Sequence, residues 1–204
     1  MGSSVKNKRD RLFFTLLFVP QASQSSWDRR AELDVFLAAP SAQSACGMED
    51  FMKVVDMHCD TIAALYENKE KGWTLQDNRL HIRLDKMKQG DYLLQNFALF
   101  VCTENCEDPY QQALTLADCF DRQMALFPEQ IGQVRCYNDI LENQKNGRMS
   151  ALLTIEEGAV CQGSLEKLRE FYDRGVRMLT LTWNFPNEIG FPNFAISGDG
   201  KPDR

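Results

Sequence analysis

Residues 53–60 read Lys-Val-Val-Asp-Met-His-Cys-Asp, a short apolar run that ends in polar, chemically active side chains. A run of this length and composition predicts a buried β-strand. Three more runs of the same kind follow, at 93–101, 150–155 and 177–182. Helix-like segments separate the four runs, and strands that alternate with helices predict a parallel α/β sheet, either open or closed into a barrel.

The segments between the strands carry the signals of amphipathic helices. Asn138 is a good N-cap for a helix that runs to about Lys145, and Ser164 and Gly175 predict the two ends of another. A longer helix, ended by Pro128, is predicted by apolar residues at helical spacing: Ala113, Ala117, Phe120, Met124 and Phe127.

The composition bounds the class of protein. With 204 residues, 44% hydrophobic and 25% charged, the chain is typical of a globular protein rather than of a fibrous or disordered one. A formal net charge of -6 argues against nucleic acid as a partner, because nucleic-acid-binding proteins carry a surplus of Lys and Arg. Seven cysteines without a CxxC pair predict reduced thiols and a cytoplasmic location rather than a disulfide framework.

Residues 1–47 differ in amino-acid composition from the domain that we expect over 48–204. They combine a basic start, an apolar run at 12–19 and a stretch rich in Ser, Gln and Ala, which predicts a poorly ordered extension. An exported protein with a signal segment here is the alternative, although the apolar run is short and no clean cleavage site follows it. We expect no transmembrane span, because spanning a bilayer takes about 20 apolar residues.

Polar side chains follow two of the predicted strands at their carboxyl ends, where parallel α/β folds gather their functional groups. His58 and Asp60 are two residues apart, so an extended strand would place both on one face, where they could share a metal ion. Asp56 has the same parity one step deeper, which favours a supporting hydrogen-bond role. One of the adjacent Glu156 and Glu157, at the end of the 150–155 strand, would add a carboxylate to the same crevice and so favour Zn²⁺ or a similar divalent ion.

Each of these signals also has a plain structural interpretation. A His-x-Asp pair is common by chance, and the adjacent Glu156 and Glu157 could belong to a solvated loop. His81, the only other histidine, precedes a short helix and is expected to be a surface residue rather than a ligand. With two histidines in all, the chain excludes a site built from three imidazoles.

Five motifs together resemble the successive signatures of the membrane dipeptidase (renal dipeptidase, M19) family of zinc metallopeptidases, in its bacterial-type branch. They follow the family's order from about Lys53 to the C-terminus: VDMHCD (55–60), LHIRLDKMKQG (80–90), QNFALF (95–100), LTIEEG (153–158) and GVRMLTLTWN (175–184). The resemblance implies the N-terminal part, about four βα units, of a TIM (β/α)₈ barrel of the metal-dependent hydrolase type.

The resemblance also implies roles for single residues. His58 and Asp60 would bind the first of two zinc ions, and Glu156 would be the catalytic carboxylate that bridges both. A metal-bridged hydroxide would then attack the peptide bond of a dipeptide, including one with a C-terminal D-residue. Trp183 and Asn184 would contact the substrate, Trp183 at a position where some relatives carry His. The full-length family enzyme would form a homodimer.

The chain ends at Arg204, after the fourth predicted strand. The family's second-zinc histidines, its substrate-binding Arg and its last-strand Asp have no counterpart before that point, so we expect a truncated, poorly active dipeptidase. Two alternatives are a non-catalytic truncated product or scaffold, and a different metal-dependent amidohydrolase. Enzymes of the latter kind usually open with His-x-His and often bridge their metals with Lys, unlike His58-x-Asp60 with Glu156.

Overall fold

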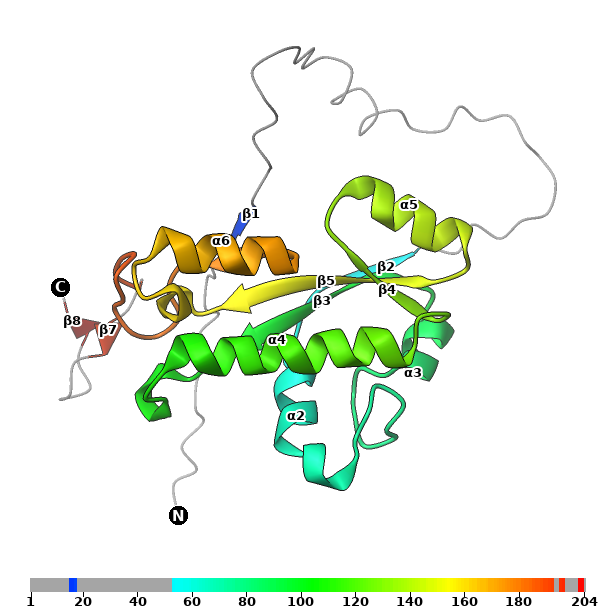
Figure 1. Cartoon of the computed structure of the whole chain (residues 1–204), viewed down its shortest axis with the longest axis horizontal. Helices are drawn as coiled ribbons and strands as arrows, with labels where there is room; N and C mark the ends of the chain where they lie inside the picture. The colour runs from blue at the N-terminus through cyan, green and yellow to red at the C-terminus, as the bar shows by residue number, and fades with distance from the viewer. Residues whose placement is uncertain (1–14, 18–52, 193–194, 197–201, 204) are drawn as a thin grey trace, which may run out of the picture. The chain divides into compact units, whose positions relative to one another are not determined.

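The computed structural model describes residues 15–17, 53–192, 195–196 and 202–203, all of which fall in one compact unit. The remainder of the predicted 1–47 extension, and with it the export-signal alternative, lies outside the described residues. The elements in chain order are β1 (Thr15–Leu17), β2 (Val54–Cys59), α2 (Thr61–Glu67), η1 (Lys69–Lys71), α3 (Leu84–Gln89), β3 (Tyr92–Phe100), η2 (Thr103–Asn105), α4 (Pro109–Leu126), β4 (Ile131–Val134), α5 (Tyr137–Lys145), β5 (Met149–Glu156), η3 (Gly158–Cys161), α6 (Leu165–Arg174), β6 (Val176–Thr180), β7 (Ala195–Ile196) and β8 (Pro202–Asp203), where η marks a 3-10 helix (Figure 1).

The four strands predicted from the sequence form one parallel array in the order β6-β5-β3-β2. Helices lie in every crossover: α2 and α3 before β3, α4 and α5 before β5, and α6 before β6. This alternation is the α/β order that the sequence predicts. β1 adds to the array as an antiparallel neighbour of β6. No helix in the described part of the chain combines the length and apolar character that crossing a bilayer requires.

The short strand β4 is not predicted by the sequence patterns. It pairs with the first half of β5, on the edge that β6 uses for the second half, so β5 and β3 remain direct neighbours. Only the end residues of β4, Ile131 and Val134, are buried. Two apolar side chains in four residues are too few to make a periodic pattern, which is why the strand is invisible in the sequence.

The helix ends predicted from the sequence agree with the structure, except at the start of α5. α6 begins after its N-cap Ser164 and ends at Gly175, whose φ of +107 is a left-handed conformation that suits glycine. α5 begins after Cys136 rather than at Asn138. The reason is Asp139, whose carboxylate accepts a hydrogen bond from the backbone N–H of Cys136 at 3.0 Å and so caps the helix from within its first turn.

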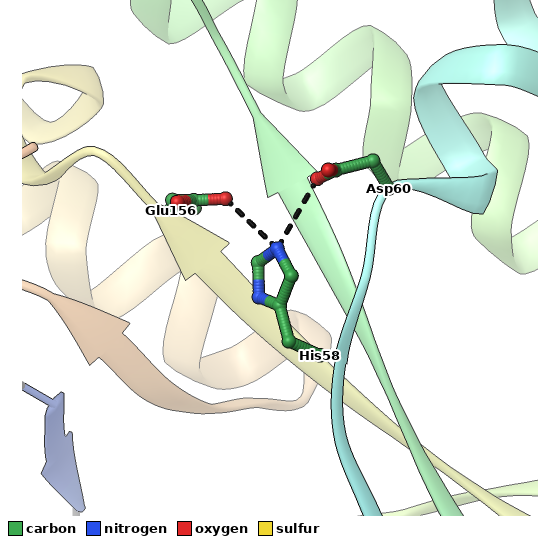
Figure 2. A group of neighbouring side chains, drawn as sticks. All are labelled: His58, Asp60 and Glu156. Carbon is green, nitrogen blue, oxygen red and sulfur yellow. Dashed lines mark ion pairs between the residues drawn. The ribbon is translucent and has the colours of Figure 1, made fainter. Parts of the chain in front are cut away.

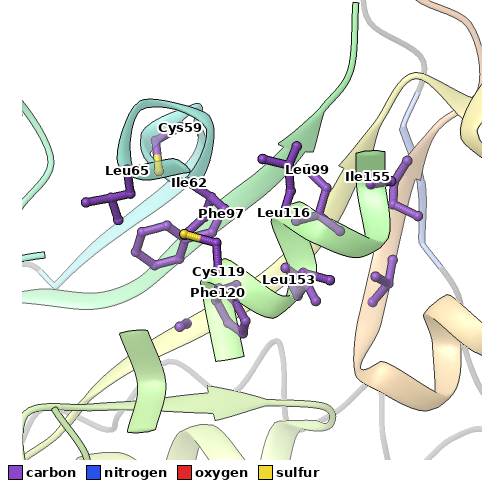
Figure 3. Packing of buried hydrophobic residues seen from close by; sticks show 14 of the residues in the cluster. Cys59, Ile62, Leu65, Phe97, Leu99, Leu116, Cys119, Phe120, Leu153 and Ile155 are labelled. Carbon is purple, nitrogen blue, oxygen red and sulfur yellow. The ribbon is translucent and has the colours of Figure 1, made fainter. Parts of the chain in front are cut away.

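Helices α2, α4 and α6 cover one face of the sheet and bury the hydrophobic core against it. Phe97 of β3 and Phe120 of α4 are fully buried, with ring centroids 5.9 Å apart. Figure 3 shows ten labelled members of this cluster: Cys59, Ile62, Leu65, Phe97, Leu99, Leu116, Cys119, Phe120, Leu153 and Ile155. Because side chains alternate along a strand, the other face of β3 and β5 carries Asn96, Thr154 and Glu156. That polar face holds the candidate site.

Candidate metal centre

Three side chains converge at the carboxyl ends of β2 and β5: His58, Asp60 and Glu156 (Figure 2). His58 Nε2 lies 3.3 Å from Asp60 Oδ1 and 3.0 Å from Glu156 Oε2. One potential ligand atom from each residue lies within 4.8 Å of the others, and no other trio of His, Cys, Asp or Glu among the described residues does so. The structure thus brings together the three residues that the sequence proposes as metal ligands.

An irregularity in β2 turns His58 toward this site. Asp56 lies opposite Gln95 of β3, and Cys59 lies opposite Phe97, so three steps along β2 match two along β3. Such an extra residue is a β-bulge, and it re-aims the side chains around it. Cys59 therefore enters the core beside Phe97, while the imidazole of His58 faces Glu156.

Asp56 does not lie one regular step below His58, because the bulge breaks the alternation on which that expectation rests. Its carboxylate accepts a hydrogen bond from the backbone N–H of His58 at 3.1 Å. The structure therefore places Asp56 against the His58 main chain, where it fixes the bulged backbone rather than the imidazole ring.

Asp60 occupies the N-cap position of α2, just beyond the end of β2. Its side chain makes no capping hydrogen bond with the helix and instead faces His58. The side chains of His58 and Asp60 are 46% and 56% exposed, whereas that of Glu156 is only 8% exposed. Glu156 therefore forms the floor of the candidate site, and His58 and Asp60 line its opening.

Strand β3 lies between β2 and β5, so His58 and Glu156 meet across it. Ala98 of β3 points to the same face as its paired Thr154 on β5, two residues before Glu156. A methyl group at this position leaves space above β3 for the larger side chains of its two neighbours.

The two carboxylates raise the pKa of His58 to about 10, since the hydrogen bonds that the imidazole donates to Asp60, the larger effect, and to Glu156 outweigh the desolvation that lowers it. A protonated Nε2 has one hydrogen to donate, yet two carboxylates converge on it. A divalent cation resolves this mismatch, because a neutral imidazole and carboxylates are ligands of borderline ions such as Zn²⁺. With metal–ligand bonds of about 2.0–2.1 Å, tetrahedral ligand atoms lie about 3.3 Å apart, which is close to the two distances measured from His58 Nε2. The donor set fits a metal ion.

Glu157 is a residue whose role the sequence patterns miss. It is 1% exposed, so the solvated-loop interpretation is wrong for this residue, and its φ of +94 is rare for a residue other than glycine. Its Oε1 accepts hydrogen bonds from Asn187 Nδ2 at 2.6 Å and from Ala159 N at 3.1 Å, and its Oε2 accepts one from Trp183 N at 3.2 Å. The only sequence signal is the pair of adjacent acidic residues before Gly158.

Trp183 and Asn184 lie in the segment that follows β6, and both are half-buried. The Trp183 ring packs edge-on against Phe100, with centroids 5.0 Å apart, and contacts Phe185 at 6.3 Å. Phe100 is paired with Glu156 across β3 and β5. An aromatic wall, Phe100 with Trp183 and Phe185, therefore stands beside the floor of the site.

A model of the membrane dipeptidase family, peptidase family M19, matches residues 43–195, which is three quarters of the chain. The chain belongs to this family. The M19 family is one of metallopeptidases, so the resemblance inferred from the five motifs is confirmed. Membership favours the dipeptidase family over the alternative of a different metal-dependent amidohydrolase.

Curated relatives of this M19 chain are named as dipeptidases. An uncharacterized dipeptidase of Schizosaccharomyces pombe is 31% identical over 135 residues, which cover 61% of this chain and 32% of that protein. Dipeptidase 3 of Rattus norvegicus is 31% identical over 151 residues, which cover 69% of this chain and 29% of that protein. The M19 chain thus spans about a third of the length of these relatives.

Solved structures show the fold. A dipeptidase AC metallopeptidase of family M19 is similar with a TM-score of 0.60 at 22% identity, over 68% of this chain and 45% of that one. A metallopeptidase from Rhodobacter sphaeroides is similar with a TM-score of 0.59 at 20% identity, over 71% of this chain and 50% of that one. The predicted fold class, the N-terminal βα units of an M19 TIM barrel, is confirmed.

Proposed function

We propose that His58, Asp60 and Glu156 hold a zinc ion in a dipeptidase that hydrolyses the peptide bond of dipeptides. The observation that carries the proposal is the convergence of both carboxylates on His58 Nε2, at 3.3 and 3.0 Å. The family relationship supports dipeptides as the substrate class. The relative from Rhodobacter sphaeroides was solved with a phosphinate mimic of the dipeptide L-Ala-D-Ala, which supports substrates with a C-terminal D-residue.

Each residue has a distinct task in this proposal. His58 gives up its proton to present a neutral imidazole, and Asp56 holds the backbone that carries it. Glu156 would help to hold the ion shared with His58 and, as a carboxylate, could also serve a second ion. Bound zinc supplies Lewis-acid activation of the scissile carbonyl and of the attacking water. Trp183 would contact the substrate from beside Glu156.

The activity of this particular chain is a separate question, because it spans about a third of its relatives. We expect it to bind zinc through the ligands present and to hydrolyse dipeptides poorly. Asn184 as a second substrate contact, the cytoplasmic location and dimerisation of the full-length enzyme stay predictions.

Zinc titration of the metal-free chain by isothermal calorimetry tests the proposed site. We expect Glu156→Gln to weaken zinc binding by at least about tenfold, because it replaces an anionic ligand by a neutral amide of the same shape. Glu129→Gln removes the same charge from an exposed residue in the turn between α4 and β4 and serves as the matched control. Hydrolysis of L-Ala-D-Ala by the zinc-loaded chain, followed by release of free alanine, then tests the activity.

Equal zinc affinities for Glu156→Gln, Glu129→Gln and the unaltered chain would contradict the metal site. Tight zinc binding at this site without any hydrolysis would favour the non-catalytic alternative for the 204-residue chain.

A further inference from the structure

The residues that follow β6 form a closed turn, here called the 181–190 segment, and Asn187 organises it. Asn187 Nδ2 donates to the carbonyl oxygen of Leu181 at 2.8 Å. Its Oδ1 accepts from the backbone N–H of Ile189 at 2.8 Å and of Gly190 at 3.2 Å. Because one side chain satisfies backbone groups at both ends of the turn, the segment behaves as a unit.

Glu157 ties this unit to the end of β5. Its carboxylate accepts a hydrogen bond from Asn187 Nδ2, at the centre of the segment, and another from Trp183 N, near its start. The donors are neutral amides, and the carboxylate is buried. A buried carboxylate that lost these donors would be left with unsatisfied charge, so the contacts strongly favour the docked arrangement.

Gly158 permits the close approach that these hydrogen bonds need. A Cβ atom at this position would lie 2.6 Å from the carbonyl oxygen of Leu181 and 2.6 Å from Ile189 Cδ1. No side chain larger than hydrogen fits there without moving the backbone of the 181–190 segment. The turn after β5 and the segment are therefore in direct contact.

The backbone of Glu157 points to a specific role for this contact. Its φ of +94 is strained for a residue with a side chain, and such conformations persist only where the surrounding contacts impose them. Glycine would adopt this φ without strain but would offer no carboxylate. The strained residue directly follows the floor ligand Glu156 and directly contacts the segment that carries Trp183.

We propose that Glu157 is a positioning residue: it couples the turn that presents Glu156 to the 181–190 segment and so holds Trp183 in the aromatic wall beside the metal. The coupling to a bound metal rests on the proposed function. The docking of the segment by Glu157 does not, because it is a property of the chain without metal.

Hydrogen–deuterium exchange of the full chain, read by mass spectrometry on peptides covering 181–190, tests the proposal. In Glu157→Gly, which relieves the backbone strain and removes all three acceptor contacts, we expect exchange in the metal-free segment to rise about tenfold, with β3 and β5 unchanged. Glu157→Gln keeps an acceptor for Asn187 and Ala159 and should restore most of the protection. Glu129→Gln is the matched control and should match the unaltered chain.

Zinc chloride alone is the probe for coupling. We expect zinc to slow exchange of the 181–190 segment in the unaltered chain and to leave it unchanged in Glu157→Gly, while both chains bind zinc within about threefold of each other. Equal exchange of the metal-free segment in Glu157→Gly and the unaltered chain would overturn the positioning role. Equal slowing by zinc in both chains would overturn the coupling. If no chain binds zinc, the proposed metal site and its coupling fail, and the metal-free comparison still decides the positioning role.

Discussion

The imidazole of His58 is the centre of the candidate site, both in its geometry and in its charges. Its ring nitrogen faces two carboxylates, one exposed and one buried. Without metal, a proton on Nε2 places a positive charge between them, which is why the pKa of His58 rises to about 10. Proton and metal compete for the same atom, so zinc binding near neutral pH should release a proton.

We expect the metal-free chain to lose stability as the pH rises from near neutral. The folded-state pKa of His58, about 10, lies above its ordinary value of 6.5, so the unfolded chain releases the proton first. The stabilisation is complete below 6.5 and is lost as the pH rises through the folded-state value. Urea unfolding at several pH values between these two limits should show a steeper decline for the unaltered chain than for His58→Gln. Parallel declines would show that the carboxylates do not hold the proton.

At the level of elements, residue types and spacing were enough to predict β2, β3, β5 and β6 and the trio at their ends. Each of these strands is a mainly apolar run, and the three site residues lie at or directly after the carboxyl ends of two of them. The bulge in β2 could not be predicted, because pairing with β3 creates it. Regular alternation still indicates the three residues that converge, although it misplaces Asp56 by one face.

Glu157 shows the second limit of prediction from sequence. An acidic residue next to glycine after a strand is typical of an exposed loop, and local pattern favours that interpretation. Its burial comes from the 181–190 segment, which is 24 or more residues further along the chain. Contacts between distant segments decide the role of such a residue, and no local window contains them.

The contact between α4 and β3 should dominate the stability of the core. We expect Phe120→Ala to reduce the free energy of unfolding by about 3–5 kcal/mol, because it leaves a cavity beside Phe97 that the packed strands cannot fill. Leu126→Ala, near the end of the same helix, removes an apolar side chain that is 51% exposed and should cost less than about 1 kcal/mol. Urea denaturation of the two variants measures both values, and similar losses would contradict this assignment of the core.

For the molecule as a whole, β5 is the strand on which the others depend. It pairs with β3 along one edge and with both β4 and β6 along the other, and it ends in Glu156. Unfolding that separates β5 from its neighbours would therefore remove the core and the candidate metal centre together. Cysteines on either side of the site can report such an event, since all six in the described part of the chain are free thiols.

We expect Cys59 and Cys161 to react with iodoacetamide only through global unfolding. Burial raises the pKa of both thiols to about 11, so at pH 8 roughly a thousandth of either is thiolate. The exposed Cys136 is the internal control and should react first. Mass spectrometry of native samples should show Cys59 and Cys161 alkylated slowly and at matching rates, with both accelerated by urea. Rapid native labelling of either would mean that the structure around that cysteine opens locally.

The number of residues between Asp56 and Cys59 matters as much as their chemistry. Three residues of β2 match two of β3. This places the imidazole of His58 on the polar face of the sheet and the thiol of Cys59 in the core. If β2 were one residue shorter at this point, the residues next to His58 could stay the same, but the imidazole would point toward the helices. Building this candidate site into another protein would therefore require both β2 and β3 with their irregular pairing. Introducing the three side chains alone would not reproduce the backbone that orients them.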